Sequence, residues 1–180
     1  MTDEELVRGC MGKALIAQKE LFERFSRKMM GVCLRYAARS EEAEDMLQNG
    51  FIKVFEKLGT FRGTGSLEGW IRKIMVNESL TYLRSNKSMK LNMDIDDVEY
   101  MVPGNSHVAE NMNEKDLLKM IQQLPPGFRT VFNMYAIEGY SHQEIAALLG
   151  ISEGTSKSQY SRAKVHLQNM LKKAQTEKIS

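Results

Sequence analysis

Apolar residues recur at steps of three and four along almost the entire chain, and no stretch alternates apolar and polar positions as a half-buried strand does. One stretch near the N-terminus has such an apolar face at Leu21, Phe22, Phe25, Met29, Val32, Cys33 and Tyr36. Each face of this kind needs a partner to cover it, so we predict an all-α protein of packed amphipathic helices.

A second helix is expected from Ser40, whose hydroxyl can accept an otherwise unpaired amide hydrogen bond as an N-cap. Glutamates follow in the first turn, where the helix dipole favours negative charge. The buried face of this helix is expected to hold Ala43, Leu47, Phe51, Val54 and Leu58. Gly59 is the expected C-cap.

The segment FRGTGS, residues 61–66, is predicted to be a short glycine-containing loop, and Ser66 is predicted to cap the helix that follows. That helix carries Leu67, Trp70, Ile71, Ile74 and Leu83 at helical spacing, and Trp70 is expected to be a core residue rather than a base-stacking one. We expect residues 1–86 to form one compact helical bundle.

Residues 87–112 lack sustained periodicity and contain Pro103, Gly104 and several asparagines. We therefore predict a linker that is flexible at least in part. A second helical domain is expected over residues 113–180. Its pattern runs over 114–124, breaks at Pro125-Pro126-Gly127 and continues over 128–138.

A helix-turn-helix is predicted after Gly139. Ser141 and Glu144 have the spacing of a capping box, Gly150 suits a left-handed turn, and Ser152 can cap the next helix. We expect this last helix to run to about residue 173, with Tyr160, Ala163, Leu167 and Leu171 facing inward. Its outward face is expected to present Lys157, Ser158, Ser161, Arg162 and Lys164, which suits entry into a DNA major groove. The alternative is a plain helical hairpin with a solvated basic face.

Charge is distributed unevenly around the net value of +2. Residues 1–90 carry 16 Lys/Arg against 12 Asp/Glu, and residues 115–180 carry nine bases against five acids, so each segment has a net charge of +4. Residues 91–114 carry six acids and no base. This distribution favours two nucleic-acid-facing modules joined by an acidic linker, and a solvated charge run is the alternative.

Several classes of protein lack support in the sequence. No apolar run approaches the roughly 20 residues of a membrane-spanning helix, and no secretory signal is present, so we expect a cytoplasmic protein without membrane insertion. Cys10 and Cys33 have no metal-ligand spacing and the three histidines are scattered, so no metal or cofactor is expected. The glycines of the FRGTGS loop are not followed by Gly-Lys-Ser/Thr, and no nucleophile–base pair stands out, so we expect no enzymatic activity.

Three segments in the first domain and one long segment in the second carry a resemblance to a known family. They are AEDMLQNGFIKVF (43–55), FRGTGSLEGWIRKIMVN (61–77), TYLRS (81–85) and the stretch from Leu124 to Lys164. In their order and spacing they resemble conserved regions two and four of the extracytoplasmic-function sigma factors of bacterial RNA polymerase. The resemblance covers about two-thirds of the chain. It implies an alternative sigma factor, with a region 2 bundle and a region 4 helix-turn-helix, that directs promoter-specific transcription initiation.

The resemblance also implies roles for particular residues. The stripe of Asp45, Gln48, Asn49 and Ile52 would bind the clamp helices of the largest subunit of core RNA polymerase. The minus-ten promoter element would be read by Phe61, Arg62, Gly63, Arg72, Lys73 and Asn77. The minus-thirty-five element would be contacted by Lys157, Ser158, Ser161, Arg162 and Lys164. Such proteins are commonly inhibited by an anti-sigma factor, which we expect as a further partner.

Three positions depart from the family pattern. Asn49 replaces a usual glutamate, Ser156 a usual apolar residue and Gln159 a frequent arginine. We expect Ser156 to bond to a carbonyl of the preceding turn, and Gln159 to remove a phosphate contact. The main alternative function is an autonomous helix-turn-helix regulator, which would need a dimerisation helix that the sequence does not reveal.

Overall fold

The structure is a computed structural model and describes residues 1–86 and 113–179. In these two ranges every regular element is a helix and no strand occurs, which confirms the all-α prediction. The predicted linker, residues 87–112, lies outside the described residues. Contacts divide the chain into two compact units, Met1–Asn86 and Lys87–Ser180, which are described separately below.

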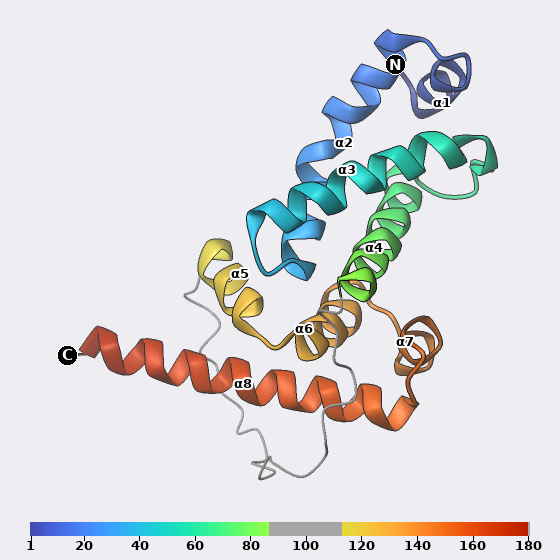
Figure 1. Cartoon of the computed structure of the whole chain (residues 1–180). Helices are drawn as coiled ribbons and strands as arrows, with labels where there is room; N and C mark the ends of the chain where they lie inside the picture. The colour runs from blue at the N-terminus through green and yellow to red at the C-terminus, as the bar shows by residue number, and fades with distance from the viewer. Residues whose placement is uncertain (87–112, 180) are drawn as a thin grey trace. The chain divides into compact units, whose positions relative to one another are not determined.

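The first unit contains four helices and one short 3-10 turn within its described residues. They are α1 (Asp3–Met11), α2 (Leu15–Tyr36), α3 (Ser40–Lys57), η1 (Leu58–Thr60) and α4 (Leu67–Ser85). Helices α2, α3 and α4 pack against one another pairwise, and α1 packs against α2 and η1 (Figure 1). Their shared core includes the buried side chains of Leu21, Phe25, Met29, Met46, Val54, Ile71, Met75 and Leu80. This packing fixes the α2–α3 surface and the loop before α4.

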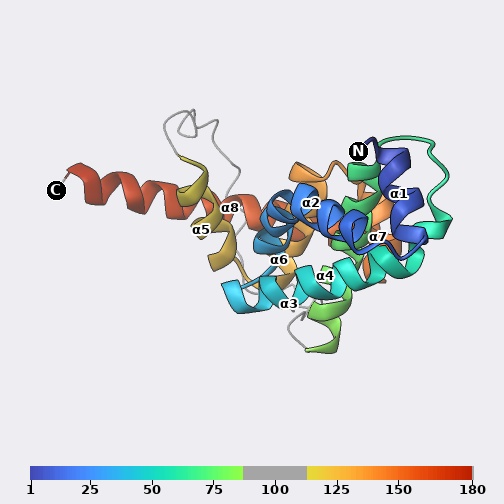
Figure 2. The ribbon, with the colours of Figure 1, turned by 90° about the horizontal axis from the view of Figure 1, so that it is seen from above.

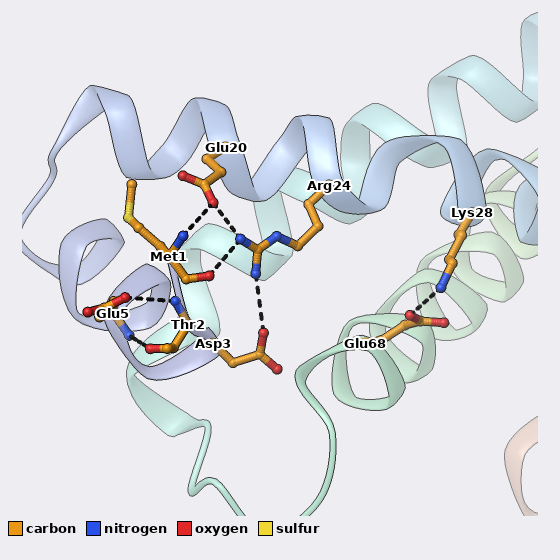
Figure 3. Close-up of polar contacts among 8 residues, drawn as sticks. All are labelled: Met1, Thr2, Asp3, Glu5, Glu20, Arg24, Lys28 and Glu68. Carbon is orange, nitrogen blue, oxygen red and sulfur yellow. Dashed lines mark hydrogen bonds and ion pairs between the residues drawn. The ribbon is translucent and has the colours of Figure 1, made fainter.

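Helix α1 was not predicted, because only two of its nine residues, Leu6 and Cys10, are buried. Its start is nevertheless well specified. Thr2 and Glu5 form a capping box, in which the Glu5 N–H donates to Thr2 Oγ1 and the Thr2 N–H donates to the Glu5 carboxylate. Figure 3 shows Arg24 of α2 bonded to the carboxylates of Asp3 and Glu20, which ties α1 to α2.

The close crossing of α3 and α4 depends on Gly50. A Cβ atom at this position would lie 2.2 Å from the Sδ atom of Met75, far inside van der Waals contact. Met75 is fully buried. The absent side chain therefore makes the room into which Met75 packs.

Three local predictions for α3 were wrong. Ser40 is the first residue of α3 and not its cap, and the N–H of Ala43, which a Ser40 cap would bind, donates to the Arg39 carbonyl at 3.2 Å. Gly59 does not end α3, which stops at Lys57 and continues as the 3-10 turn η1. Leu47 is half-buried rather than a core residue.

In the second unit the described residues form α5 (Glu114–Gln123), α6 (Pro126–Phe132), the π-helical turn η4 (Asn133–Ile137), α7 (His142–Leu149) and α8 (Glu153–Ile179). Helices α5, α6 and α7 all contact α8. One hydrophobic core cluster of this unit consists of Ile121, Leu124, Phe128, Ala163 and Leu167. The last turns of α8 extend past α5 in both views and are exposed, and the helix runs beyond the expected end near residue 173 (Figures 1 and 2).

A buried arginine connects α5 to α6. Arg129 is only 3% exposed, and its guanidinium donates to the carbonyl oxygens of Ile121, Gln122 and Leu124 at 2.9–3.3 Å. These carbonyls lie in the last turn and at the C-cap of α5, where helical partners run out, although the Ile121 oxygen also accepts the Leu124 N–H at 3.1 Å. Arg129 therefore caps α5 from the neighbouring helix and fixes the turn at Pro125.

The helix-turn-helix signals are confirmed at each predicted position. Ser141 and Glu144 form the capping box at the start of α7. Gly150 ends α7 with φ of 67°, in the left-handed region that glycine adopts without strain. The Thr155 N–H donates to Ser152 Oγ at 3.0 Å, so Ser152 caps α8. These three signals are local in sequence, which is why the sequence alone predicts them.

Candidate functional site

An open hollow of about 390 Å³ lies between the 61–66 loop and the start of α4, and we call it the loop pocket. It is lined by Thr60, Phe61, Arg62, Thr64, Gly65, Ser66, Gly69, Trp70 and Lys73. The rings of Phe61 and Trp70 meet at a centroid distance of 5.5 Å and an angle of 57°. The pocket therefore combines an aromatic surface with two exposed cations, Arg62 and Lys73.

Local contacts fix the loop that forms this pocket. Ser66 Oγ accepts a hydrogen bond from the Gly69 N–H at 3.0 Å, which confirms Ser66 as the cap of α4. In the first turn of α4, Glu68 accepts a hydrogen bond from Lys28 of α2 at 2.7 Å (Figure 3). Gly63 and Gly65 have φ values of 72° and 115°, which side-chain-bearing residues rarely adopt, so the loop conformation requires glycine there.

The predicted minus-ten residues are placed differently with respect to the loop pocket. Phe61, Arg62 and Lys73 line it. Asn77 is exposed one helical turn after Lys73, on the same side of α4. Two further predicted residues do not line the pocket: Gly63 in the loop and Arg72, which is half-buried.

Trp70 was predicted to be a core residue and is instead half-buried in the wall of the loop pocket. Helical spacing correctly placed it next to the buried Ile71. Spacing alone does not reveal that the loop after η1 folds back so that Phe61 meets its ring. The preceding FRGTGS loop was the available signal, because a loop with two glycines can approach a helix start closely.

A second hollow, of about 480 Å³, follows the contact between α2 and α3, and we call it the α2–α3 groove. It is lined by Phe22, Glu44, Asp45, Leu47, Gln48, Phe51, Ile52 and Phe55. Phe51 is 3% exposed and forms its floor, with the ring of Phe22 at a centroid distance of 4.8 Å. Ile52 is 51% exposed at its edge.

The predicted polymerase-binding stripe overlaps this groove in part. Asp45, Gln48 and Ile52 line the groove, whereas Asn49 is exposed outside it. The Tyr82 hydroxyl donates to the Asp45 carboxylate at 3.4 Å. Burial raises the pKa of Tyr82, and the nearby Asp45 carboxylate adds to this effect. Asp45 is thereby held toward α4.

The apolar walls of the groove were not predicted from the sequence. Phe22 and Leu47 were both expected in the core, yet Phe22 is 42% exposed and both line the groove together with Phe55. The signal was present in the sequence. Phe22 directly follows Leu21, and adjacent helical residues point about 100° apart, so both cannot face the centre of one core.

Helix α8 presents most of the predicted minus-thirty-five residues, with one exception. Lys157 is exposed, and Ser158 and Ser161 are half-buried. The Lys164 ammonium lies 4.7 Å from the centre of the Tyr160 ring, which is half-buried rather than fully inward. The Ser158 hydroxyl already donates to carbonyl oxygens of the preceding turn, at 3.0–3.1 Å, and keeps its lone pairs for a further donor.

The prediction that Arg162 faces outward was wrong, because its side chain is only 9% exposed. Arg162 is five positions after Lys157, which places it about 140° round the helix from that exposed residue. It directly precedes Ala163, a fully buried core residue. The side chain therefore lies at the border of the buried face. At such a border, helical spacing alone does not predict whether a side chain is exposed or buried.

Two departures from the family pattern are also buried. Ser156 is fully buried, and its Oγ atom is 2.8 Å from Nδ1 of His142 in α7, a partner other than the expected carbonyl of the preceding turn. Gln159 is 2% exposed and therefore packs inside the unit, away from any phosphate. Burial lowers the pKa of His142, and the positive charge of Lys157 lowers it further.

Within the described ranges 1–86 and 113–179, no three His, Cys, Asp or Glu side chains come together as metal ligands would. Cys10 and Cys33 are buried free thiols. None of the helices in these ranges is long and apolar enough to cross a membrane.

Comparison with known proteins identifies both units. Residues 21–89 match the family model of sigma-70 region 2, and residues 114–167 match that of sigma-70 region 4. The RNA polymerase sigma-H factor of Pseudomonas aeruginosa is 27% identical over 173 residues, which cover 90% of each chain. The ECF RNA polymerase sigma-E factor of Haemophilus influenzae is 28% identical over 183 residues, covering 95% of this chain and 96% of the relative.

Solved structures agree with the fold. The sigma factor RpoE of Bartonella quintana, determined in complex with the anti-sigma factor NepR, has a TM-score of 0.54 at 23% identity, covering 86% of this chain and 96% of that one. CnrH, determined with the cytosolic domain of CnrY, has a TM-score of 0.50 at 20% identity, covering 94% and 97%. The two family matches together cover about two-thirds of the chain, in the order of regions 2 and 4. The chain therefore belongs to the extracytoplasmic-function group of the sigma-70 family of RNA polymerase sigma factors.

Proposed function

We propose that this protein is an alternative sigma factor that binds core RNA polymerase and directs it to promoters with specific minus-ten and minus-thirty-five elements. The observation that carries the proposal is the loop pocket, because it lies inside the region 2 match and joins an aromatic surface to exposed cations. The comparisons give no support to an autonomous helix-turn-helix regulator. We propose no catalytic role for the chain.

In this account the loop pocket takes a base of the separated minus-ten strand. An unpaired base can stack on Phe61 or Trp70, and Arg62 and Lys73 can hold the adjacent phosphates. The Asn77 amide, one turn further along α4, offers both a donor and an acceptor to a base edge. Extruding a base costs a few kcal/mol, so a small number of such contacts is enough to favour strand opening.

The α2–α3 groove is the proposed site for core polymerase, with the clamp helices of its largest subunit as the partner. An apolar floor with exposed apolar edges, rimmed by Asp45 and Gln48, is the arrangement that a helix from another protein can fill. The rim is polar, and such a rim allows the partner to be released after initiation. Asn49 remains part of the proposed interface at its margin.

Helix α8 is the proposed reader of the minus-thirty-five element. Lys157, Ser158 and Ser161 lie in its first turns, where a recognition helix meets base edges, and Lys164 follows as a phosphate contact. Because Arg162 is buried, we assign it to positioning α8 and not to contacting DNA.

We further propose that residues 1–86 and 113–180 act as separate domains on the linker 87–112. Joining two DNA-reading modules raises the effective concentration of each for its promoter element. Both act where polymerase and promoter DNA are found, in the cytoplasm. Inhibition by an anti-sigma factor is proposed because a solved relative, the sigma factor RpoE of Bartonella quintana, was determined with one.

A binding experiment with purified core polymerase tests the proposal. We expect the full chain to co-elute with core, and the resulting complex, but not the chain alone, to bind a single-stranded minus-ten oligonucleotide. Arg62→Ala and Lys73→Ala should weaken oligonucleotide binding without changing co-elution. A chain that fails to bind core, and binds duplex DNA equally well with and without it, would overturn the proposal.

A further inference from the structure

A small cluster of side chains joins the two helices of the helix-turn-helix. His142 is the first residue of α7, and its Nδ1 atom is 2.8 Å from Oγ of Ser156 in α8. The Ser156 side chain is fully buried, so water cannot replace this hydrogen bond. The contact links positions 14 residues apart, across the turn at Gly150.

Aromatic rings hold the imidazole in place. The Tyr135 ring of η4 stacks on it with a centroid distance of 4.2 Å and an angle of 10°. The Tyr160 ring of α8 approaches it at 5.9 Å and 57°, and also meets Tyr135 at 4.6 Å. The imidazole is thereby oriented toward Ser156 by rings from two different elements.

Ser156 lies in the first turn of α8, directly before Lys157 and two positions before Ser158. These are the residues that the proposed function assigns to the minus-thirty-five element. Any contact that fixes Ser156 in place therefore also fixes the segment of α8 that would enter the major groove. A shift of this turn of about 1 Å would misplace side chains that must meet base edges.

We propose that neutral His142 is a positioning residue for promoter recognition, which holds the first turn of α8 through Ser156 and releases it when the imidazole is protonated. The inference rests on the proposed function of α8. Through the contact between His142 and Ser156, the pH would affect the geometry of the recognition helix.

The charges around His142 favour its neutral form. Burial lowers the pKa of the imidazole most, and Lys157 of α8 lowers it further, while Glu153 of α8 opposes them. The neighbouring Tyr135 and Tyr160 face the imidazole with their aromatic rings. The Glu144 carboxylate of α7 accepts a hydrogen bond from the Ser141 N–H. The positive end of the α7 dipole also disfavours an added proton. Protonation, moreover, places a hydrogen on both ring nitrogens, so that Nδ1 can only donate to Ser156.

The sign of the pH effect follows from the lowered pKa. A released His142 takes up a proton near its ordinary value of 6.5, and the packed one does so only at lower pH. The ordering of α8 is therefore fully favoured above pH 6.5 and is lost progressively as the pH falls toward the packed value. Between pH 7.5 and pH 6.0 this linkage changes the equilibrium by up to about fourfold.

Nuclear magnetic resonance titration of the full chain tests the contact directly. We expect the His142 ring to titrate below 6.5, and the amide signals of Ser156 and Lys157 to follow the same curve. Ser156→Ala should uncouple the α8 amides from the titration of His142, and His166→Gln should leave this coupling unchanged. A His142 ring that titrates without any response of the α8 amides would overturn the inference.

Transcription by the reconstituted holoenzyme supplies the functional readout. The ratio of initiation on a promoter to initiation on the same promoter with a scrambled minus-thirty-five element isolates α8. We expect this ratio to fall by up to about fourfold from pH 7.5 to pH 6.0, and to stay level in His142→Gln, whose neutral amide can still bond to Ser156. Identical profiles for the two proteins would overturn the inference. A chain that shows the coupled titration but never initiates transcription supports the contact and refutes the proposed function.

Discussion

The ring of Phe61, in the loop after η1, meets the indole of Trp70, in the first turn of α4, at a centroid distance of 5.5 Å. This contact brings a loop residue and a helix residue together as one wall of the loop pocket. Because both rings are half-buried, each still has surface to offer to a base. The pair explains how a loop with two glycines becomes a defined binding surface.

Replacing Trp70 with alanine should impair strand opening. Stacking of a base on an aromatic ring is worth about 1–3 kcal/mol, so Trp70→Ala should reduce the population of open complexes by roughly tenfold. Permanganate reactivity of minus-ten thymines in the holoenzyme–promoter complex measures this population. Trp70→Phe keeps an aromatic ring and is the matched control. Unchanged reactivity in Trp70→Ala, at unchanged core binding, would exclude stacking on this ring.

Two substitutions distinguish the α2–α3 groove from the stripe predicted from the sequence. Phe22 lines the groove but lies outside the stripe, and Asn49 belongs to the stripe but lies outside the groove. If core polymerase fills the groove, Phe22→Ala should weaken binding by about tenfold or more, as central apolar contacts do, and Asn49→Ala by much less. Titration of labelled protein with core polymerase measures both affinities. The opposite order would assign binding to the exposed stripe instead.

Alanine substitution should have opposite effects on stability at two helical glycines, Gly50 at the crossing of α3 and α4 and Gly31 in α2. Gly50→Ala forces Met75 out of its place, because the new Cβ would lie 2.2 Å from Met75 Sδ, and overpacking of this kind costs about 1–3 kcal/mol. At Gly31 of α2, no heavy atom outside the adjacent residues and the nearby backbone of the helix lies within 4 Å of an added Cβ. Gly31→Ala should therefore raise the free energy of unfolding by up to about 1 kcal/mol. Denaturant unfolding compares the two, and a stabilising Gly50→Ala would refute the close approach.

Arg129 should carry much of the stability of the second unit. Arg129→Ala removes the donors of three carbonyl oxygens at the end of α5, which should lower the free energy of unfolding by about 2–4 kcal/mol. Arg129→Lys restores the charge but not the planar set of donors, so an intermediate loss is expected. Thermal unfolding, followed by the loss of helical circular dichroism, ranks the stabilities of the natural chain and the two variants. Equal midpoints for the natural chain and Arg129→Ala would contradict this capping role.

Short-range signals were the most reliable part of the sequence. The caps at Ser66, Ser141 and Ser152 and the left-handed turn at Gly150 depend on residues within a few positions, and all are confirmed. The cap expected at Ser40 is wrong because the helix begins at Ser40 itself, and the N–H of Ala43 donates to the Arg39 carbonyl. A sequence shows which residues can cap a helix, but not which of two nearby acceptors is used.

The sequence predicts which residues belong to a site, but not how they come together to form its surface. Phe61, Arg62 and Lys73 were assigned to one function, and the structure brings them to one pocket. Its remaining wall, Trp70, depends on how the loop folds back. Likewise, the bond between His142 and Ser156 spans the turn between two helices, and no periodicity within either helix reveals it.

Run-off transcription with purified core polymerase on a pool of genomic fragments tests the central claim most directly. We predict that core alone gives no specific start sites, and that adding this protein produces discrete starts preceded by a shared pair of minus-ten and minus-thirty-five elements. Transcripts that are the same with and without the protein, under conditions where a known sigma factor activates the same core, would contradict the claim that this chain directs initiation.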